Sequence, residues 1–465
     1  MNSLIGLVLE SLLRDEAPAP QLLEAAGERD PVAASQAFLV ASERRELARC
    51  RASWVPALLA APYPGMGAAN LAALASAYAE QEGCELDPSQ TPGLVPILGA
   101  SEHLGRCLVA NPSWADDLVG DPPVAYAPGH KQLNFAEIRE AKLRGTIKIV
   151  ARERMGCPLE TSFEEIADLA DESLSQALRC ASDATGIEAP SMLAMGQLAG
   201  RELALYAPIV LLFVEPAESG LANVIGRAQQ LEVFLKHFVQ ELEADSSLGA
   251  LFSSANVMGR GDVLAANVED TLAMFTAWAG NPASGGGGGL RPLVARSQVA
   301  LELVEGYHGA ACGVTFESLR VKERRRKQRR SRDAQSDDLA RGVGSVSDVD
   351  AVARGLRARV GDNLVPLEVD AVLTCLSRMR SHTHQPAVDC DELAEAYSWL
   401  RRAEHSLQLM HGSTSQIPSD PEGQLSLARC MGYREPETSV ARERWSRDRQ
   451  DAHDQIEKQF EILFG

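Results

Sequence analysis

The stretch that decides the fold is SMLAMGQLAGRELALYAPIVLLFV, residues Ser191–Val214. It contains an apolar lead-in, a glycine-bearing turn at Gly196–Gly200 and an unbroken apolar run at Ile209–Val214. A short run of Ile, Val, Leu and Phe between two prolines is typical of a strand that is buried on both faces. Pro208 cannot donate a hydrogen bond to a neighbouring strand, so it fits only at the start of that strand. We therefore expect Ile209–Val214 to be a central strand of a sheet.

The composition is that of an ordinary globular protein with several domains. The chain has 465 residues, of which 45% are hydrophobic and 23% are charged, and its many Ala and Leu residues favour helix. The formal net charge of −19 argues against general nucleic-acid binding and favours a cytoplasmic protein. The nine cysteines include no C-x-x-C pair, which argues against a disulfide framework or a zinc site.

Targeting and membrane segments are not expected. The apolar run at the beginning of the chain has no basic residues before it, and Arg14, Asp15 and Glu16 follow it directly, unlike a signal peptide. No apolar run approaches the roughly 20 residues of a membrane helix.

Apolar residues at helical spacing predict several helices. The longer candidates are Val32–Arg51, Ala68–Gln81, Thr161–Leu178 and Ala222–Glu243. For the third of these, Thr161 or Ser162 with Glu164 or Glu165 predicts a capping box at its beginning.

The turn and the apolar run together resemble the signature of the glutamine synthetase adenylyltransferase family, G-M-G-K-L-G-G-R-E-L-N-Y-S-S-D-I-D-L-I-F. The residues that match in register are Met195, Gly196, Leu198, Gly200, Arg201, Glu202, Leu203, Ile209, Leu211 and Phe213. A second matching segment is AYSWLRRAEHSLQ, which begins at Ala396 and includes Tyr397, Leu400, Arg401, Glu404 and His405. The resemblance covers roughly residues 90–465, one half of an enzyme that carries two such halves in tandem.

The resemblance implies a fold and an activity. The fold is α+β and mostly helical, with a nucleotidyltransferase-like mixed sheet flanked by helical domains. We predict four consecutive parts: a helical region at 1–125, the nucleotidyltransferase-like domain at 126–320, a basic linker at 321–339 and a helical bundle at 340–465. The family adenylylates a tyrosine of glutamine synthetase, and its other half removes the AMP by phosphorolysis.

The positions at which the family carries its metal-binding aspartates are changed in this chain. Pro208 and Val210 stand at the two aspartates of the D-x-D pair, and Ala255, in the expected neighbouring strand Ala250–Val257, stands at the third. Nucleotidyl transfer uses Mg²⁺, which needs hard oxygen ligands, and these side chains offer none. We therefore expect no catalytic residue, no metal ligand and no cofactor, with Mg²⁺ and ATP needed only if the chain is active.

Residues of the turn are the candidates for nucleotide binding that the resemblance leaves. They are Gly196, Gly200, Arg201 and Glu202. Backbone N–H groups at such a turn can bind phosphate without a particular side chain.

The strongly basic run Lys322–Arg332, KERRRKQRRSR, has two interpretations. The favoured one is a solvated linker, and the other is a patch that interacts with an anionic partner. No aromatic residue is interleaved for stacking on bases.

Three functions remain open, so the sequence does not decide whether the chain is an enzyme. The favoured one is a catalytically degenerate regulator of nitrogen metabolism that contacts glutamine synthetase, a PII-type signalling protein or a complete family member. The alternative is an active nucleotidyltransferase that transfers or removes AMP with relocated acids such as Asp262, Glu269 and Asp270. The third is a helical scaffold with no link to nucleotides.

Overall fold

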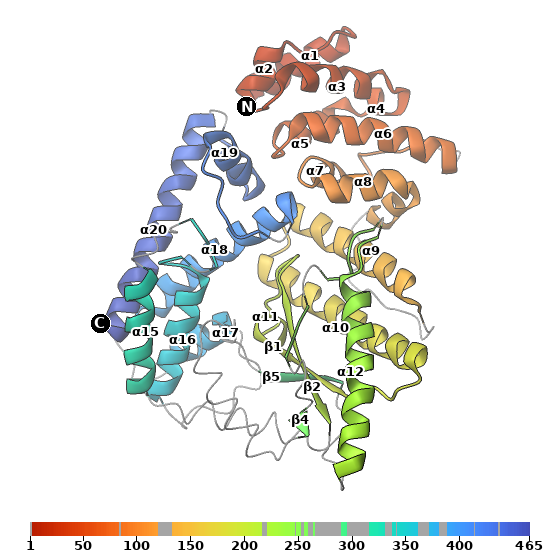
Figure 1. Cartoon of the computed structure of the whole chain (residues 1–465). Coiled ribbons are helices and arrows are strands. Elements are labelled where there is room, and N and C mark those ends of the chain that lie inside the picture. The colour runs from red at the N-terminus through yellow and green to blue at the C-terminus, as the bar shows by residue number, and fades with distance from the viewer. Residues whose placement is uncertain are drawn as a thin grey trace. The chain divides into compact units, whose positions relative to one another are not determined.

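A computed structural model gives the structure of the chain (Figure 1). It describes residues 2–82, 85–119, 133–215, 221–246, 248–252, 255–258, 264–265, 290–294, 316–330, 337–340, 342–360, 372–380, 388–412, 414–435 and 438–465. The described residues fall into two compact units, each built from segments that are far apart in the sequence. Unit 1 comprises residues 1–127, 143–162 and 402–450, and unit 2 comprises residues 128–142, 163–401 and 451–465. The boundaries of the four consecutive parts expected from the sequence remain a prediction.

The regular elements that the structure describes in unit 1 are helices. Its own helices are α1 (Asn2–Leu13), α2 (Pro20–Ala25), α3 (Pro31–Glu43), α4 (Arg45–Arg49), α5 (Arg51–Leu59), α6 (Pro64–Glu82), α7 (Leu94–Leu98), α8 (Glu102–Ala110), the 3₁₀ helix η1 (Pro112–Leu118) and α19 (Pro421–Cys430). Four further helices contribute residues to both units: α9 (Phe135–Arg154), α10 (Leu159–Thr185), α18 (Cys390–His411) and α20 (Thr438–Phe464). Within unit 1, α6 packs on α3 and α8.

The single helix expected at Val32–Arg51 is three helices, so that prediction is wrong in its extent. The side chain of Asp30 accepts a hydrogen bond from the backbone of Ala33 and caps α3. The chain then leaves the helical conformation at Arg44, which has an extended backbone with ψ of 124°. The expected helix at Ala68–Gln81 is confirmed as part of α6.

Unit 2 contains the sheet. Its strands are β1 (Ser191–Met195), β2 (Ile209–Glu215), β3 (Ala255–Met258), β4 (Leu264–Ala265) and β5 (Leu290–Val294), and its own helices are α11 (Gly196–Ala199), α12 (Leu221–Glu243), α15 (Phe316–Arg330), α16 (Val346–Val360) and α17 (Val372–Arg380). The strand order is β3-β2-β1-β5, and β4 also pairs with β2. β1 is antiparallel to β2 and β5, whereas β3 and β4 are parallel to β2. The expected α+β, mostly helical fold with a mixed, nucleotidyltransferase-like sheet is confirmed.

β2 is a central strand, as the apolar run predicts. Leu211 and Leu212 are successive residues on opposite faces of β2, and both are at most 1% exposed. α12 lies alongside the sheet (Figure 1), and the ring of Phe213 on β2 meets that of Phe238 on α12 edge to face, with centroids 5.6 Å apart. The expected helix Ala222–Glu243 is therefore confirmed, and its apolar side packs on β2.

The capping box predicted for the helix at Thr161–Leu178, which the structure shows as α10, is wrong. α10 begins at Leu159, directly after Pro158, so Thr161 and Ser162 lie inside its first turn. The hydroxyl of Ser162 donates back to the carbonyl of Pro158 at 3.5 Å instead of accepting from the backbone. A proline just before or at the first helical turn starts a helix without a capping side chain, because its missing N–H would have no helical partner.

The basic run is helical as far as Arg330, which differs from the expected linker. Phe316–Arg330 forms α15, which packs on α16, and α16 packs on α17. The side chain of Glu323 in the middle of the run is only 1% exposed. The linker interpretation fails for these residues because they bury one face of a regular helix.

Among the described helices, none has a stretch that is both long enough and apolar enough to cross a membrane.

Candidate functional site

The turn after β1 has an unusual backbone. Gly196, the first residue of α11, has φ of 64°, and Arg201, just after this short helix, has φ of 57°. The left-handed region suits glycine but is strained for a residue with a side chain such as Arg201. Surrounding contacts must therefore hold Arg201 in this conformation.

Two arginines tie the turn to α10. The guanidinium of Arg201 lies 2.7 Å from the carboxylate of Asp168. Arg291 of β5 binds both carboxylate oxygens of Asp171, at 2.6 and 2.8 Å, and also donates to the carbonyl of Leu198 in the turn at 3.1 Å. Burial raises the pKa of Asp171, although Arg291 acts in the opposite direction. A bidentate pair of this kind fixes the position of both partners.

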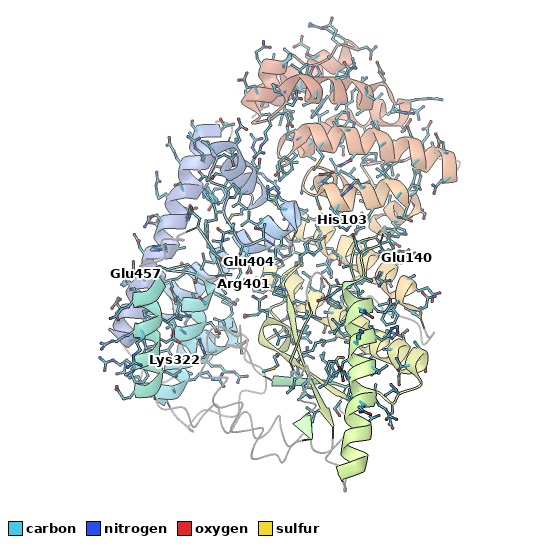
Figure 2. The ribbon with its side chains drawn as sticks, in the orientation of Figure 1. His103, Glu140, Lys322, Arg401, Glu404 and Glu457 are labelled. Atoms are coloured by element: carbon cyan, nitrogen blue, oxygen red, sulfur yellow. The ribbon has the colours of Figure 1, made fainter. Side chains whose placement is uncertain are left out.

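Glu202 joins the turn to α17 and α18. Its side chain is buried, and its carboxylate accepts hydrogen bonds from the hydroxyl of Tyr397 at 2.7 Å and from the backbone N–H of Leu373 at 3.2 Å. Its backbone carbonyl accepts a hydrogen bond from the guanidinium of Arg401, which extends from α18 (Figure 2). Burial raises the pKa of Glu202, and the opposing effects of Tyr397 and Arg401 do not cancel it.

Arg401 is itself enclosed. It is 1% exposed, and its guanidinium lies over the rings of Phe163 and Tyr397, at 4.8 and 6.0 Å from their centroids. Arg201 and Glu202, two predicted nucleotide-binding residues, are therefore engaged by other side chains of unit 2. Nucleotide binding by Gly196, Gly200, Arg201 and Glu202 remains a prediction.

The beginning of β2 is apolar and partly accessible. Pro208 is exposed and Val210 is half-buried, while Ile209 between them is fully buried. Val210 pairs with Met195, the last residue of β1, so it lies next to the turn. The two aspartate positions of the family pattern are thus brought to the turn, but the residues there are Pro and Val.

The third position comes from β3. Ala255 pairs with Ile209, the residue between Pro208 and Val210, so it lies at the same end of the sheet. Because successive strand residues belong to opposite faces, the register assigns Ala255 to the face of Ile209, and its expected grouping with Pro208 and Val210 is not supported. The residue level with Val210 is Asn256, which was not a candidate at the sequence level. No charged residue stands at any of these four positions.

This residue set does not fit a magnesium ion. Mg²⁺ needs near-octahedral oxygen coordination, normally including carboxylates, and Pro208, Val210 and Ala255 have no side-chain oxygen. Among the residues that the structure describes, no group of three or more His, Cys, Asp and Glu side chains is arranged to hold a metal. The alternative acids Asp262, Glu269 and Asp270 lie outside the described residues.

The fold and this arrangement define a mostly helical, nucleotidyltransferase-like α+β protein. A family model described as GlnD PII-uridylyltransferase matches residues 317–464. More particularly, the chain is 27% identical over 426 residues to the bifunctional glutamine synthetase adenylyltransferase/adenylyl-removing enzyme of Nitrosococcus oceani, covering 79% of this chain and 42% of that protein. It is 26% identical over 382 residues to the protein of the same name from Streptomyces avermitilis, covering 76% of this chain and 38% of that protein.

These similarities confirm the resemblance found in the sequence: the chain is similar to the glutamine synthetase adenylyltransferases. The chain spans about two fifths of the length of these curated relatives.

Sequence reasoning missed the partners that hold the turn. Asp168, Asp171 and Arg291 stand in segments that carry no recognisable motif in common. Tyr397 and Arg401 match the family pattern, and this match was the only signal considered that could have marked them as partners of the turn. Nothing in the sequence, however, links them to Glu202 across about 200 residues of chain.

Proposed function

We propose that this chain is an adenylyltransferase-like regulator that acts by binding other proteins and does not itself transfer or remove AMP. The observation that supports this most directly is the register of β2 with β1 and β3. Val210 lies beside the turn and pairs with Asn256, and Ala255 pairs with Ile209, whereas the family pattern has carboxylates at the positions of Pro208, Val210 and Ala255.

The physical reason is the charge of the substrate. In nucleotidyl transfer, a divalent cation neutralises the phosphates and polarises the phosphorus that is attacked. Without carboxylates the end of this sheet cannot hold the cation in the family's way, and a triphosphate would meet no compensating charge from these residues.

The proposed partners follow from the relatives. Those proteins are named for their action on glutamine synthetase, and the family model that matches residues 317–464 is named for PII. We expect this chain to contact glutamine synthetase, a PII-type protein or a complete relative, and so to influence nitrogen metabolism. The turn and the helices around it are still ordered. This supports a protein-binding role, which depends on the folded structure and not on catalytic residues.

The test is an assay of AMP transfer. Purified chain is incubated with glutamine synthetase and labelled ATP, and separately with adenylylated glutamine synthetase and phosphate, in Mg²⁺ or Mn²⁺. The Nitrosococcus oceani relative serves as the positive control. We expect no label transferred or released above background by this chain.

Turnover would contradict the proposal, and two variants would then locate its origin. If Asp262→Ala or Asp270→Ala abolished that turnover, the relocated acids would be responsible. Binding of the inactive chain to glutamine synthetase, a PII-type protein or the complete relative, measured by calorimetry, is the expected positive result. Absence of binding to all three would refute the regulatory role.

A further inference from the structure

Helix α15 is the most basic element of the described chain. Its sequence, FESLRVKERRRKQRR, contains eight Lys and Arg residues and two Glu residues, so its formal charge is +8 − 2 = +6. The whole chain has a formal charge of −19. A concentrated positive charge on such an acidic protein needs an explanation, and the fold accounts for only part of it.

The inner face of α15 is neutralised within unit 2. The guanidinium of Arg326 lies 2.5 Å from Glu323 on the same helix and 2.6 Å from Asp348 on α16. Arg354 of α16 approaches Glu323 at 3.8 Å. These groups are largely buried, so they hold α15 on α16.

The end of α20 neutralises a second part of the helix. Lys327 bridges Glu457 and Glu461 at 2.9 and 2.5 Å, and Figure 2 labels Lys322 on α15 and Glu457 on α20. Arg320 donates to the carbonyl of Gly465 at 2.7 Å, and Arg324 donates to that of Phe464. α15 is therefore a fixed helix rather than a flexible basic segment.

The outer face of α15 differs from the parts that contact α16 and α20, because it is open to solvent. Val321 is 50% exposed, and Arg325, one turn further along the helix, is exposed as well. The ion pairs of α15 among the described residues include neither Lys322 nor Arg325. Burial, together with Arg354 and Arg326, lowers the pKa of Lys322. A carboxylate that approached this face would meet the exposed Arg325, the half-buried Lys322 and one exposed apolar side chain.

The same surface is poorly suited to nucleic acid. Phe316 is the only aromatic residue of α15. Its ring is stacked on that of Phe464 with centroids 6.0 Å apart, and the guanidinium of Arg359 covers it at 5.6 Å. It is therefore not available to stack on a base. A long polyanion would also be repelled by the net charge of the chain, whereas a short acidic segment would be repelled less.

We propose that Val321, Lys322 and Arg325 form a docking surface for an acidic, amphipathic helix of a partner protein. The two cations meet carboxylates of that helix, and Val321 meets an apolar side chain between them. This surface is independent of the end of the sheet, so the AMP-transfer assay does not bear on it.

The test uses a defined probe. A fluorescent helical peptide of about 20 residues, with Glu at i and i+4 and Leu between them on one face, is titrated with the full chain at low and at physiological salt. We expect Lys322→Glu/Arg325→Glu to weaken binding about tenfold or more, and Val321→Ser to weaken it about threefold. The matched control, Arg14→Glu/Arg106→Glu, changes the net charge equally on exposed side chains of unit 1 and should leave binding nearly unchanged.

Two further probes separate the possible partners. A single-stranded oligonucleotide of about 20 thymidines and vesicles with phosphatidylserine report on binding through charge alone, and Val321→Ser should not affect either. The proposal is overturned if the peptide fails to bind, if Val321→Ser leaves peptide binding unchanged, or if either polyanion binds more tightly than the peptide. Circular dichroism and thermal melts of each variant check that the chain is still folded.

Discussion

The turn after β1 and the beginning of β2 are neighbours in the sheet, but they are built very differently. Met195, at the end of β1, pairs with Val210. On the turn side, Arg201 and Glu202 are engaged by ion pairs and hydrogen bonds to other elements of unit 2. On the strand side, Pro208 and Val210 offer only apolar contacts. One region keeps ion pairs and hydrogen bonds to its neighbours, and the adjacent one has none of the carboxylates that the reaction needs.

The difference shows that a motif can persist for reasons of packing. Glu202 is buried, and its carboxylate and carbonyl satisfy Tyr397, Leu373 and Arg401. Such a residue is required by the fold whether or not a nucleotide binds, because its loss would leave buried donors unpaired. The match of the turn to the family pattern is therefore strong support for the fold and weak support for catalysis.

The largest effect is expected when the contacts of the turn are broken. Glu202→Ala removes the acceptor of Tyr397 and of the Leu373 N–H inside the protein, and should lower the free energy of unfolding by about 3 kcal/mol. Urea denaturation monitored by circular dichroism measures the change. Glu164→Ala on α10, an exposed glutamate, is the matched control and should change stability by less than about 0.5 kcal/mol. Equal effects of the two substitutions would show that Glu202 does not hold the turn.

A smaller effect is expected from the backbone of the turn. Gly196 has φ of 64°, so Gly196→Ala should cost about 1–2 kcal/mol. Gly226 in α12 has open space at its Cβ position, and Gly226→Ala should stabilise by about 0.5–1 kcal/mol because alanine favours helix. The opposite signs are the diagnostic result, and a stabilising Gly196→Ala would mean that the turn does not have this conformation.

A pH titration sharpens the view of Glu202 by comparison with a second buried glutamate, Glu153 of unit 1. Burial opposes ionisation of Glu153, but His405, 2.7 Å away, and Arg154 lower its pKa to about 2. Its contribution to stability is present above the ordinary glutamate value and is lost as the pH falls toward 2. The pKa of Glu202 is raised, so its contribution is present at low pH and is lost as the pH rises through that pKa.

The two dependences should have opposite signs in glutamine variants. The stability difference between the wild type and Glu153→Gln should shrink on acidification below about pH 4.5. The difference between the wild type and Glu202→Gln should shrink as the pH rises above the ordinary glutamate pKa of about 4.5. Urea denaturation at a series of pH values measures both, and parallel slopes would contradict the assigned environments.

The sheet could be predicted from the sequence because its signal is local. The apolar run Ile209–Val214 has the length and composition of a buried strand, and the structure makes it β2. Its neighbour β3 was expected at Ala250–Val257 and is found at Ala255–Met258, so the two ranges share only residues 255–257. The ends of a strand depend on pairing with other segments, which a single sequence does not specify.

The basic run and the contacts of the turn could not be predicted, for a common reason. In α15, Glu323 and Arg326 are buried by a partner helix, and their charges pair with Asp348 across it. Sequence composition indicates solvent exposure for such residues, because unpaired charges are rarely buried. Tertiary pairing reverses that expectation, both here and at Glu202.

The smallest effect on stability is expected from restoring carboxylates at the beginning of β2. Pro208 is exposed and Val210 is half-buried, so Pro208→Asp/Val210→Asp should cost about 1 kcal/mol or less. The double variant should still transfer no AMP, because the position contributed by β3 would remain neutral.

A third carboxylate can be added to the double variant at either of two positions in β3. Since Asn256 is level with Val210 and Ala255 with Ile209, adding Asn256→Asp completes one possible carboxylate set and adding Ala255→Asp completes another. Because Asn256 shares a face of the sheet with Val210 and Ala255 does not, Mn²⁺ binding, followed by electron paramagnetic resonance, should appear in the triple variant with Asn256→Asp. It should be absent from the variant with Ala255→Asp and from the wild type. Mn²⁺ bound equally well by the wild type would mean that acids elsewhere hold the metal, and would remove the contrast between the turn and the strand.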